Sequence, residues 1–560
     1  MILLATLFIP LLVAGIMILI PGAQGKTHRT LAAVGTAAAF LVSLVLWFQY
    51  DSTNAAFQFV IDYPWITSLD VGFRFGLDGM SLLLVLLTTF MMTIAVLSSW
   101  ESVRDREKQY YIWMLILEFG MLGVFMALDT FLFYIFWELV LIPMYFLIGV
   151  WGGRDRIYAS MKFFIYTMGG SLLMLVAIIW LGAYAEGSGG FTTDLQKLMS
   201  IAPNTALDAQ KWLFLAFALS FCIKVPVFPL HTWLPDAHTQ APTAGSVILA
   251  GVMLKMGTYG LIRFNLQLFP QSSLHFADFI SVLAVIGIIY GALLAMVQTD
   301  VKRLVAYSSV AHLGFVTLGI FSMTTEGVQG AVIQMVNHGL STGMLFLLVG
   351  YIYDRRHTRQ MSDFGGLARS MPVYATFFAI AVFASVGLPG LNGFVGEYLT
   401  LIGAFTSQHL STTWFAILGA TGVIFAAVYL LILFQRMFFG PITHPENEKG
   451  KIKDLSRLET GILVPIVIFI VWIGIHPNTF LHVSEASSRA VVGVVEELSG
   501  STDYTAEVQE RKSGQAIADE GSENRAVPTS GPMPEETEGE SAPGAQVLAP
   551  PPVVQPEGGQ

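Results

Sequence analysis

Apolar residues along this chain gather in long runs that short polar or charged segments separate. Crossing about 30 Å of hydrocarbon takes roughly 20 residues of helix, so each run of that length predicts a membrane-spanning helix. The pattern predicts an all-α polytopic membrane protein with fourteen spans, near residues 2–21, 30–49, 77–99, 110–128, 130–151, 161–183, 211–233, 244–266, 277–297, 303–323, 330–352, 372–406, 413–438 and 461–481. The first run has no basic segment before it and exceeds the apolar core of a signal peptide, so we expect it to be retained as a span.

Two of the runs are interrupted by proline and glycine. The seventh contains "IKVPVFP" and the twelfth contains "ASVGLPGLNGFVGEY". The breaks are five spans apart, and an odd offset reverses the direction of crossing. We therefore predict two inverted five-helix repeats, spans 4–8 over 110–266 and spans 9–13 over 277–438. Paired broken helices in two halves indicate an ion-handling site near the membrane midplane.

The rest of the chain divides into three predicted segments. Residues 1–109 hold spans 1–3, and residues 461–498 hold span 14 and a C-terminal segment. Residues 499–560 are rich in Glu, Pro, Gly and Ser, a composition that is typical of disorder. From residue 496 onward there are thirteen acidic and three basic residues, so this tail accounts for the net charge of −10.

Lysine and arginine are distributed unevenly between the predicted loops. Nineteen lie in or beside odd-numbered loops and four in or beside even-numbered loops. Because these residues accumulate on the cytoplasmic side of a membrane, the odd loops are predicted to be cytoplasmic. Both termini should then lie on the outer side of a bacterial inner membrane.

Composition limits the chemistry available to the chain. It has 560 residues, of which 54% are hydrophobic and only 12% charged, against about 25% charged in soluble domains. Its single cysteine, Cys222, excludes an internal disulfide and a thiolate-held iron–sulfur or zinc site. No dinucleotide fingerprint or phosphate loop is present. We expect no cofactor, metal or nucleic acid on this chain, and energy supplied by an ion gradient or by attached subunits.

Several ionisable residues lie well inside the predicted spans: Glu118, Glu138, Lys224, Lys255, His312, His338 and Glu397. A single lysine or aspartate at the centre of a span costs about 2.5–3.5 kcal/mol, so several of them in one chain indicate a function. Burial lowers the pKa of an amine and raises that of a carboxyl, and a neighbouring opposite charge reverses both effects. A buried Glu–Lys pair is therefore balanced near the point at which a proton transfers.

These residues predict a proton relay. Glu138 and Lys224 are the natural pair, and Lys255 is the next proton site. His312 and His338 connect Lys255 to Glu397, which faces an exit.

Each histidine also has a simpler explanation. His312 and His338 lie on apolar faces and can be hydrogen-bonded core residues, and nothing in the sequence supports the further alternative of haem ligation. His231 and His238 flank the proline-rich turn after span 7, where they can cap or line a cytoplasmic loop.

Three charged residues near or inside the spans have structural alternatives. Glu118 either tunes the Glu–Lys pair or bonds a neighbouring helix. Lys162 and Arg263 are close enough to span ends to extend their charged groups to the membrane surface.

Three stretches of this sequence resemble a known family. "KVPVFPLHTWLPDAHTQAPTAGSVILAGVMLKMGTYG", "DVKRLVAYSSVAHLGF" and "LPGLNGFVGEY" are similar to the antiporter-like membrane subunits of respiratory complex I, the NADH:quinone oxidoreductase of bacteria. The resemblance runs from about residue 70 to about residue 480 and implies fourteen helices with inverted repeats. It also implies that Glu138, Lys224, Lys255 and Glu397 are proton-handling positions, with His312 and His338 on the hydrophilic axis between them.

The residue at position 397 favours one branch of that family. Other antiporter-like members typically have lysine there, so Glu397 favours the M-type subunits over the L and N types and over Mrp-type sodium/proton antiporters. Membership implies proton translocation driven by quinone reduction elsewhere, with NADH, FMN, iron–sulfur clusters and quinone in partner subunits and L- and N-type chains as neighbours. A sodium/proton antiporter subunit and a structural scaffold are the alternatives.

Overall fold

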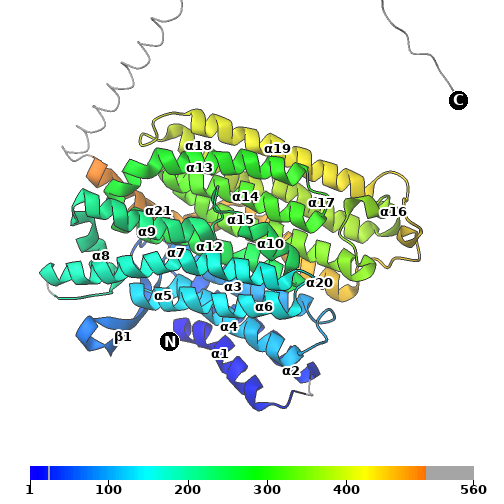
Figure 1. Cartoon of the computed structure of the whole chain (residues 1–560), viewed down its shortest axis with the longest axis horizontal. Coiled ribbons are helices and arrows are strands. Elements are labelled where there is room, and N and C mark those ends of the chain that lie inside the picture. The colour runs from blue at the N-terminus through cyan, green and yellow to red at the C-terminus, as the bar shows by residue number, and fades with distance from the viewer. Residues whose placement is uncertain (23–24, 189, 500–560) are drawn as a thin grey trace, which may run out of the picture. The chain divides into compact units, whose positions relative to one another are not determined.

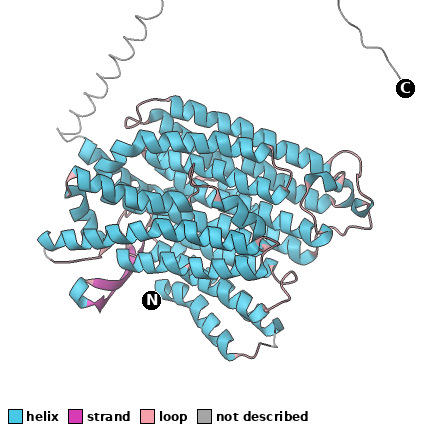
Figure 2. Ribbon diagram, viewed as in Figure 1, coloured by secondary structure: helices cyan, strands magenta, loops and turns pink. Residues whose placement is uncertain are grey.

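The computed structural model describes residues 1–22, 25–188 and 190–499. The predicted tail, from residue 500 onward, lies outside this part of the chain. The helices run side by side along one direction, with α1 and α2 at one edge of the bundle and α19 at the opposite edge (Figure 1). Helix predominates throughout, and the one pair of strands drawn is a small hairpin (Figure 2).

Among the described residues, twelve continuous helical segments are long and apolar enough to cross a membrane. They are α1 (Ile2–Leu19), α2 (Gly25–Gln49), α3 (Gly79–Ser98), α4 (Glu107–Met126), α5 with α6 (Thr130–Leu139 and Leu141–Trp151), α7 (Arg156–Tyr184), the stretch Thr243–Leu266, α13 (Pro270–Met296), α14 (Val301–Phe321), α15 (Thr325–Arg356), α19 (Trp414–Phe438) and α20 (Arg457–Ile475). Each coincides with a predicted span, so the prediction of an all-α polytopic membrane protein is confirmed.

The two remaining predicted spans are interrupted, as expected. The seventh consists of α9 (Leu207–Lys224) and α10 (Trp233–Gln240). The twelfth consists of α17 (Pro372–Val386) and α18 (Asn392–Thr406). Both breaks occur at the predicted proline and glycine residues. The inverted relationship between the two five-helix units stays a prediction.

The eighth span contains an irregularity that the sequence pattern does not predict. Its α-helical parts, α11 (Thr243–Ile248) and α12 (Leu254–Gly260), alternate with two π-helical turns, η4 (Leu249–Met253) and η5 (Leu261–Leu266). Such turns often accompany functional sites, because the wider winding leaves backbone carbonyl groups free for other partners.

Short polar residues fix where several helices begin. Asp78 caps α3 in a reciprocal arrangement with Ser81, and Ser456 caps α20 in the same way with Glu459. A side-chain oxygen there accepts from backbone N–H groups that have no partner within the helix. Asp300 likewise accepts from two N–H groups at the start of α14. Two of these caps place the first turns of α3 and α14, which are largely buried in the bundle.

One end of the bundle carries the hairpin of β1 (Gln58–Ile66) and β2 (Val71–Leu77), together with α8 (Leu195–Ile201). Arg74 on β2 lies between Asp70 at 2.6 Å and Asp129 at 3.1 Å. Burial opposes ionisation of Asp70, but hydrogen bonds from Lys197, Thr192 and Arg74 lower its pKa to about 2. This cluster joins the hairpin to the loop before α8.

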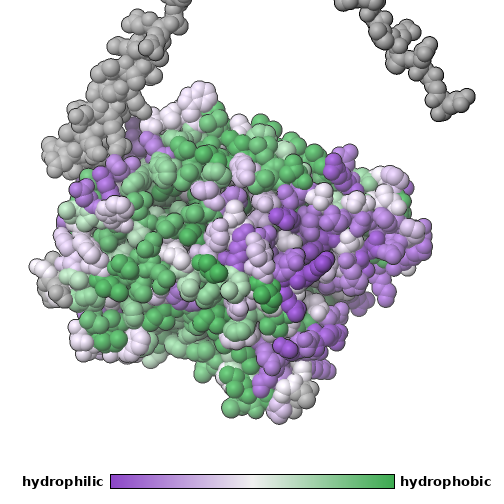
Figure 3. All heavy atoms as spheres, viewed as in Figure 1, coloured by the Kyte–Doolittle hydropathy of each residue, from purple (hydrophilic) through white to green (hydrophobic). Residues whose placement is uncertain are grey.

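The opposite end holds the loops that are rich in lysine and arginine, and includes α16 (Leu367–Ser370). Asp236 on α10 forms an ion pair with Lys162 on α7 at 2.7 Å and lies 3.8 Å from Arg303 on α14. Hydrophilic residues gather at this end of the surface, next to a broad hydrophobic band (Figure 3). The odd-numbered loops therefore share one end of the bundle, as their charges predict.

Helix α21 (Asn478–Ser499) packs on α3, α15 and α13 at the hairpin end. Its buried face includes Val483, Val491 and Val495. Ser487 accepts a 3.0 Å hydrogen bond from the backbone N–H of Gly79, where a Cβ would overlap the carbonyl of Val483. Residue 79 must therefore be small for α21 to lie against the start of α3.

Candidate functional site

The centre of the site is a contact between a lysine and a histidine inside the bundle. The Lys255 ammonium on α12 lies 2.7 Å from Nδ1 of His338 on α15, and both side chains are at most 2% exposed. The ammonium also donates to the carbonyl of Ala250, which belongs to the π-helical turn η4. The irregular winding of the eighth span thus supplies an acceptor for a lysine within the membrane.

A second histidine continues this contact toward the broken twelfth span. The rings of His338 and His312 are 5.9 Å apart between centroids. Nδ1 of His312 lies 2.9 Å from the Glu397 carboxylate on α18. Lys255, His338, His312 and Glu397 therefore lie in one buried row across four elements, with both histidines between Lys255 and Glu397.

Two further residues contact this row, and the sequence analysis did not single them out. Gln334 donates to Glu397 at 3.2 Å, and the Tyr429 hydroxyl lies 3.5 Å from Nε2 of His312. Gln334 precedes His338 by one helical turn, so i, i+4 spacing was a signal that could have identified it. Nothing in the sequence distinguishes Tyr429 from the other tyrosines of the spans.

The break in the twelfth span is held open by asparagine side chains. Asn337 donates to the carbonyl of Asn392 at 2.7 Å, and Asn392 donates to the carbonyl of Asn337 at 3.2 Å. Gly387 ends α17 at φ +81°, and a Cβ there would lie 2.9 Å from the Glu397 carboxylate. A glycine therefore allows both the left-handed turn and the close approach of the acid.

Glu138 and Lys224 do not form the close pair that the sequence analysis expected. The Lys224 ammonium is 1% exposed, stands 5.3 Å from the ring centre of Trp137 and 5.5 Å from that of Phe163, and makes no hydrogen bond within the described chain. Glu138 interacts with it electrostatically but is not in direct contact, and its carboxyl lies beside the hydroxyls of Tyr134 and Ser171. Lys224 and Glu138 are neighbours rather than a closed ion pair.

Lys224 and Lys255 lie on elements that pack against each other. α9 ends at Lys224, and α12, which carries Lys255, packs against that end. The approach depends on Gly257, whose missing Cβ would lie 2.8 Å from the Phe221 carbonyl oxygen and 3.1 Å from the Cβ of Lys224.

Glu118 is separate from the row. It is fully buried in α4, and neither carboxyl oxygen has a hydrogen-bond partner in the described structure. Neither of the two roles expected for it, tuning the Glu–Lys pair or bonding a neighbouring helix, corresponds to a direct polar contact.

His238 is not the loop residue that its proline-rich surroundings suggested. It is fully buried in α10, and its ring stacks on Phe346 at 4.6 Å. It interacts electrostatically with Lys255 and with Lys302, whose ammonium donates to the Ala241 carbonyl at 2.5 Å. His231 remains at the turn itself, next to the rings of Phe228 and Tyr290.

The expectation that Arg263 extends to the membrane surface is wrong. Arg263 is 2% exposed and its guanidinium forms an ion pair with Asp78, the capping residue of α3. Packing of the eighth span against α3 encloses the charge inside the protein, where a carboxylate replaces water. Lys162, by contrast, lies at the charged end and pairs with Asp236.

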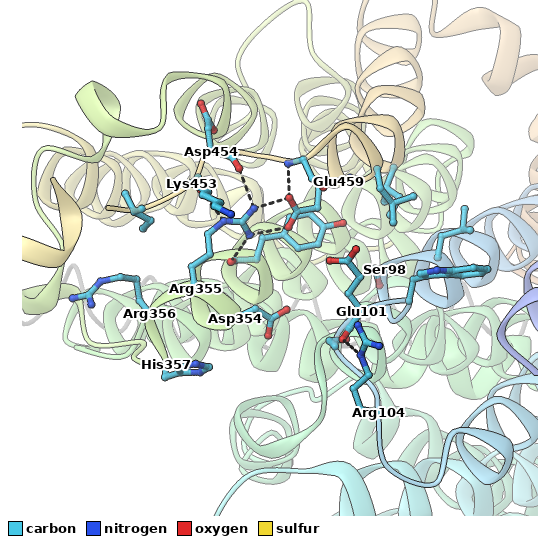
Figure 4. Close-up of a pocket in the computed structure, with 18 of the residues that line it drawn as sticks. Ser98, Glu101, Arg104, Asp354, Arg355, Arg356, His357, Lys453, Asp454 and Glu459 are labelled. Atoms are coloured by element: carbon cyan, nitrogen blue, oxygen red, sulfur yellow. Dashed lines mark hydrogen bonds and ion pairs between the residues drawn. The ribbon is translucent and has the colours of Figure 1, made fainter. Parts of the chain in front are cut away.

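A polar cavity of about 1,100 Å³ lies at the charged end of the bundle, away from the buried row. Figure 4 shows Arg355 inside it, reaching both carboxylate oxygens of Glu459 at 2.8 and 2.6 Å. Asp454 accepts from the backbone N–H groups of Val373 and Tyr374 at the start of α17. These bonds tie α15, α17 and α20 together, so we regard the cavity wall as structural.

The comparisons with known proteins agree with this architecture. The family model described as "NADH:quinone oxidoreductase/Mrp antiporter, TM" matches residues 127–426. The chain is 45% identical to NADH-quinone oxidoreductase subunit M of Rhodobacter capsulatus, over 84% of this chain and 92% of that protein.

Solved structures give the same result. A chain of respiratory complex I from Thermus thermophilus matches with a TM-score of 0.79 and 34% identity, over 88% of this chain and all of that one. A chain of the Mrp complex from Dietzia matches with a TM-score of 0.75 at 18% identity, over 88% of this chain and 99% of that one, which shows a shared fold. The chain therefore belongs to the NADH:quinone oxidoreductase/Mrp antiporter family of membrane subunits, as a subunit of the M type.

Proposed function

We propose that the buried row Lys255, His338, His312 and Glu397 carries protons within the membrane part of an NADH:quinone oxidoreductase, and that Lys224 and Glu138 control its loading. As an M-type subunit, the chain is part of a proton-translocating, multi-subunit membrane complex. The proposal concerns which residues do this work and how.

The observation that carries the proposal is that the row consists of two hydrogen-bonded pairs whose histidine rings lie 5.9 Å apart between centroids. Lys255 to His338 spans 2.7 Å and His312 to Glu397 spans 2.9 Å, both within hydrogen-bonding range. Imidazole can accept a proton at one nitrogen and release one at the other, so two histidines suit the gap between an amine and a carboxylate. A purely structural core would not need four titratable groups in succession inside a membrane, where each is costly.

Lys224 is suited to control when a proton enters the row. Its ammonium lies over two aromatic rings rather than in a closed ion pair, and Glu138 is near enough to affect it. Bringing Glu138 closer would stabilise the charge on Lys224, and withdrawing it would favour release of the proton. α9 packs against α12, the helix that carries Lys255, so we expect this contact to couple the charge state of Lys224 to that of Lys255.

His238 and Lys302 provide a route between the row and the charged end. His238 interacts electrostatically with both Lys255 and Lys302, and Lys302 lies beside Asp300 and Arg359 at that end. We take this end as cytoplasmic because lysine and arginine collect there. With that orientation we expect both termini on the outer side of a bacterial inner membrane.

Energy for transport comes from chemistry outside this chain. We expect NADH, FMN, iron–sulfur clusters and quinone in partner subunits, and L- and N-type chains as membrane neighbours. The sodium/proton antiporter alternative has weaker support, since the Mrp chain shares the fold at 18% identity whereas the complex I chain shares 34%.

The test is NADH-driven proton uptake by inverted membrane vesicles that carry Lys255→Ala or Glu138→Gln. We expect uptake to be lost while assembled complex, measured as NADH oxidation with a soluble electron acceptor, stays at wild-type level. Lys451→Ala is a matched control, because Lys451 is exposed and pairs only with Glu448 three residues away. Full proton uptake by the Lys255 variant in assembled complex would refute the proposal that the buried row carries protons.

A further inference from the structure

An apolar cavity lies beside α15, the helix that carries His338. It is on the side of α15 that faces away from the buried row of titratable residues. It has a volume of about 450 Å³ and is enclosed by α2, α3, α15, α20 and the start of α21. Every residue that lines it is apolar except Thr479. Its innermost wall includes Leu87 of α3 and two residues of α15, Val336 and Leu340. Val336 and Leu340 are one helical turn apart, and His338 lies between them in the sequence.

The mouth of this cavity is continuous with the membrane-facing surface. Phe48 of α2 and Trp472 of α20 line it and are 81% and 43% exposed. Beside it on the same helices, Leu41 and Ile468 are 63% and 55% exposed. Both helices are long and apolar enough to span a membrane, so the mouth opens on the outer surface of the bundle within the membrane.

Size and polarity restrict what can enter. An α-helix with side chains is about 10–12 Å wide, too wide for a cavity of this volume, which is within the roughly 300–1,000 Å³ of small-ligand pockets. An extended peptide would bring N–H and C=O groups into a wall that has one hydroxyl to offer, at a cost of several kcal/mol for each unsatisfied group. A flexible hydrocarbon chain meets neither obstacle.

An open cleft with four polar residues in its lining, together with Ile475 and Pro477, adjoins the apolar cavity at the hairpin end of the bundle. Thr479 lines both, and the cleft also includes His476, Asn478 and His482, at the junction of α20 and α21. An apolar slot that leads to a polar rim matches a molecule with one apolar tail and one polar head.

We propose that this cavity binds one acyl chain of a membrane phospholipid, with the headgroup over His476, Asn478 and His482. The acyl chain of the lipid fills the space between α3, α15 and α20 and packs directly on Val336 and Leu340. It thereby excludes water from the lipid-facing side of the turn that carries His338. Binding itself does not depend on the proposed relay; only this consequence rests on it.

The test uses the assembled complex in its membrane, supplemented with a phosphatidylethanolamine that carries a photoreactive diazirine in the middle of one acyl chain. Illumination should label peptides that contain Phe40, Leu87 or Trp472. Leu44→Trp or Leu86→Trp, each of which fills the cavity from a partly exposed position, should abolish this labelling. Leu41→Trp is the matched control on α2, outside the cavity, and should keep it.

Three outcomes would overturn the proposal. One is labelling of the cavity residues that is no stronger than that of the exposed surface around Leu41. Another is labelling that persists in both cavity-filling variants. The third is cross-linking of the cavity residues to a partner subunit through a cysteine-reactive probe placed at Phe48→Cys, with no lipid label, because the occupant would then be protein. Proton uptake is not a readout here, so failure of the relay leaves the lipid site standing.

Discussion

Asn337 on α15 and Asn392 at the start of α18 each donate a hydrogen bond to the other's backbone carbonyl, beside the break that separates α18 from α17. The pair joins the middle of α15 to the first residue of the half-helix that presents Glu397. It therefore sets the position of the acid relative to His312, which belongs to a third helix.

Replacing Asn392 by Ala should lower both stability and proton uptake. The substitution removes the side-chain donor, and the carbonyl of Asn337 keeps its bond from the Ser341 hydroxyl at 3.0 Å. Because no carbonyl is left without a donor, we expect the loss of this hydrogen bond to cost about 0.5–1.5 kcal/mol. Measurement is by thermal inactivation of NADH oxidation and by vesicle proton uptake. Asn204→Ala, which removes an exposed bond to the Ser200 carbonyl, should change neither.

Tyr429→Phe should reduce proton uptake several-fold and leave assembly intact. Only the hydroxyl is removed, and that hydroxyl lies 3.5 Å from Nε2 of His312. Without it, His312 loses the polar group opposite Glu397 and holds its ring orientation less well. Tyr374→Phe is the matched control, since the Tyr374 hydroxyl donates to the Leu348 carbonyl away from the row. Equal uptake by the two variants would contradict a role for Tyr429.

Gly257→Ala should destabilise the contact between the broken seventh span and α12. The added Cβ would lie 2.8 Å from the Phe221 carbonyl oxygen, a backbone atom that cannot rotate away. Overpacking of this kind costs about 1–3 kcal/mol and displaces the neighbouring element. We expect a lower temperature of thermal inactivation, with proton uptake reduced more than NADH oxidation. Gly169→Ala on α7 provides the comparison, because no atom lies within 4 Å of its Cβ position.

Charge inside apolar runs made the buried titratable residues of the proposed relay identifiable from the sequence. Lys224, Lys255 and Glu397 stand out because nothing else near them is polar enough to explain their cost. The two broken spans were predictable for the same reason, since proline and glycine are conspicuous in a helix that must satisfy its own backbone.

What escaped prediction depends on contacts between distant parts of the chain. Tyr429 and His312 are 117 positions apart, and only packing brings them together. The burial of His238 and the pairing of Arg263 with Asp78 likewise depend on which helices become neighbours. The strands β1 and β2 were not predicted either, because their apolar residues lie between two stronger helical runs.

Breaking the pair of Arg263 and Asp78 from either side should prevent accumulation of the complex. The two side chains are 2% and 3% exposed, so Asp78→Asn would leave a buried guanidinium without its countercharge. Removing one member of a buried pair costs about 3–5 kcal/mol. Asp78→Asn also retains much of the cap of α3, which separates loss of charge from loss of the cap. The amount of assembled complex in membranes is the measurement.

Arg489→Ala serves as the comparison for that variant. Arg489 pairs with Glu485 on the exposed surface of α21, where such pairs contribute about 0–1 kcal/mol. Wild-type amounts of Asp78→Asn complex would show that the buried ion pair is dispensable.

The hairpin end should lose order as the pH falls. Although burial opposes it, hydrogen bonds from Lys197, Thr192 and Arg74 lower the pKa of Asp70 to about 2, from an ordinary 3.8. A carboxyl with a lowered pKa stabilises the folded state above its unfolded pKa, and this contribution is lost as the pH drops from about 3.8 through 2. Backbone amides of β2 and of the loop before α8 should therefore exchange faster with solvent deuterium across that window.

Asp70→Asn separates this effect from general acid unfolding. The variant lacks the carboxylate at every pH, so these amides should already exchange faster than wild type at pH 7. The difference between the two proteins should then shrink as wild-type Asp70 becomes protonated near pH 2. Asp51→Asn is the control, since Asp51 bonds only residues of its own exposed turn and Gln58. A constant difference down to pH 2 would mean that Asp70 acts through its shape rather than its charge.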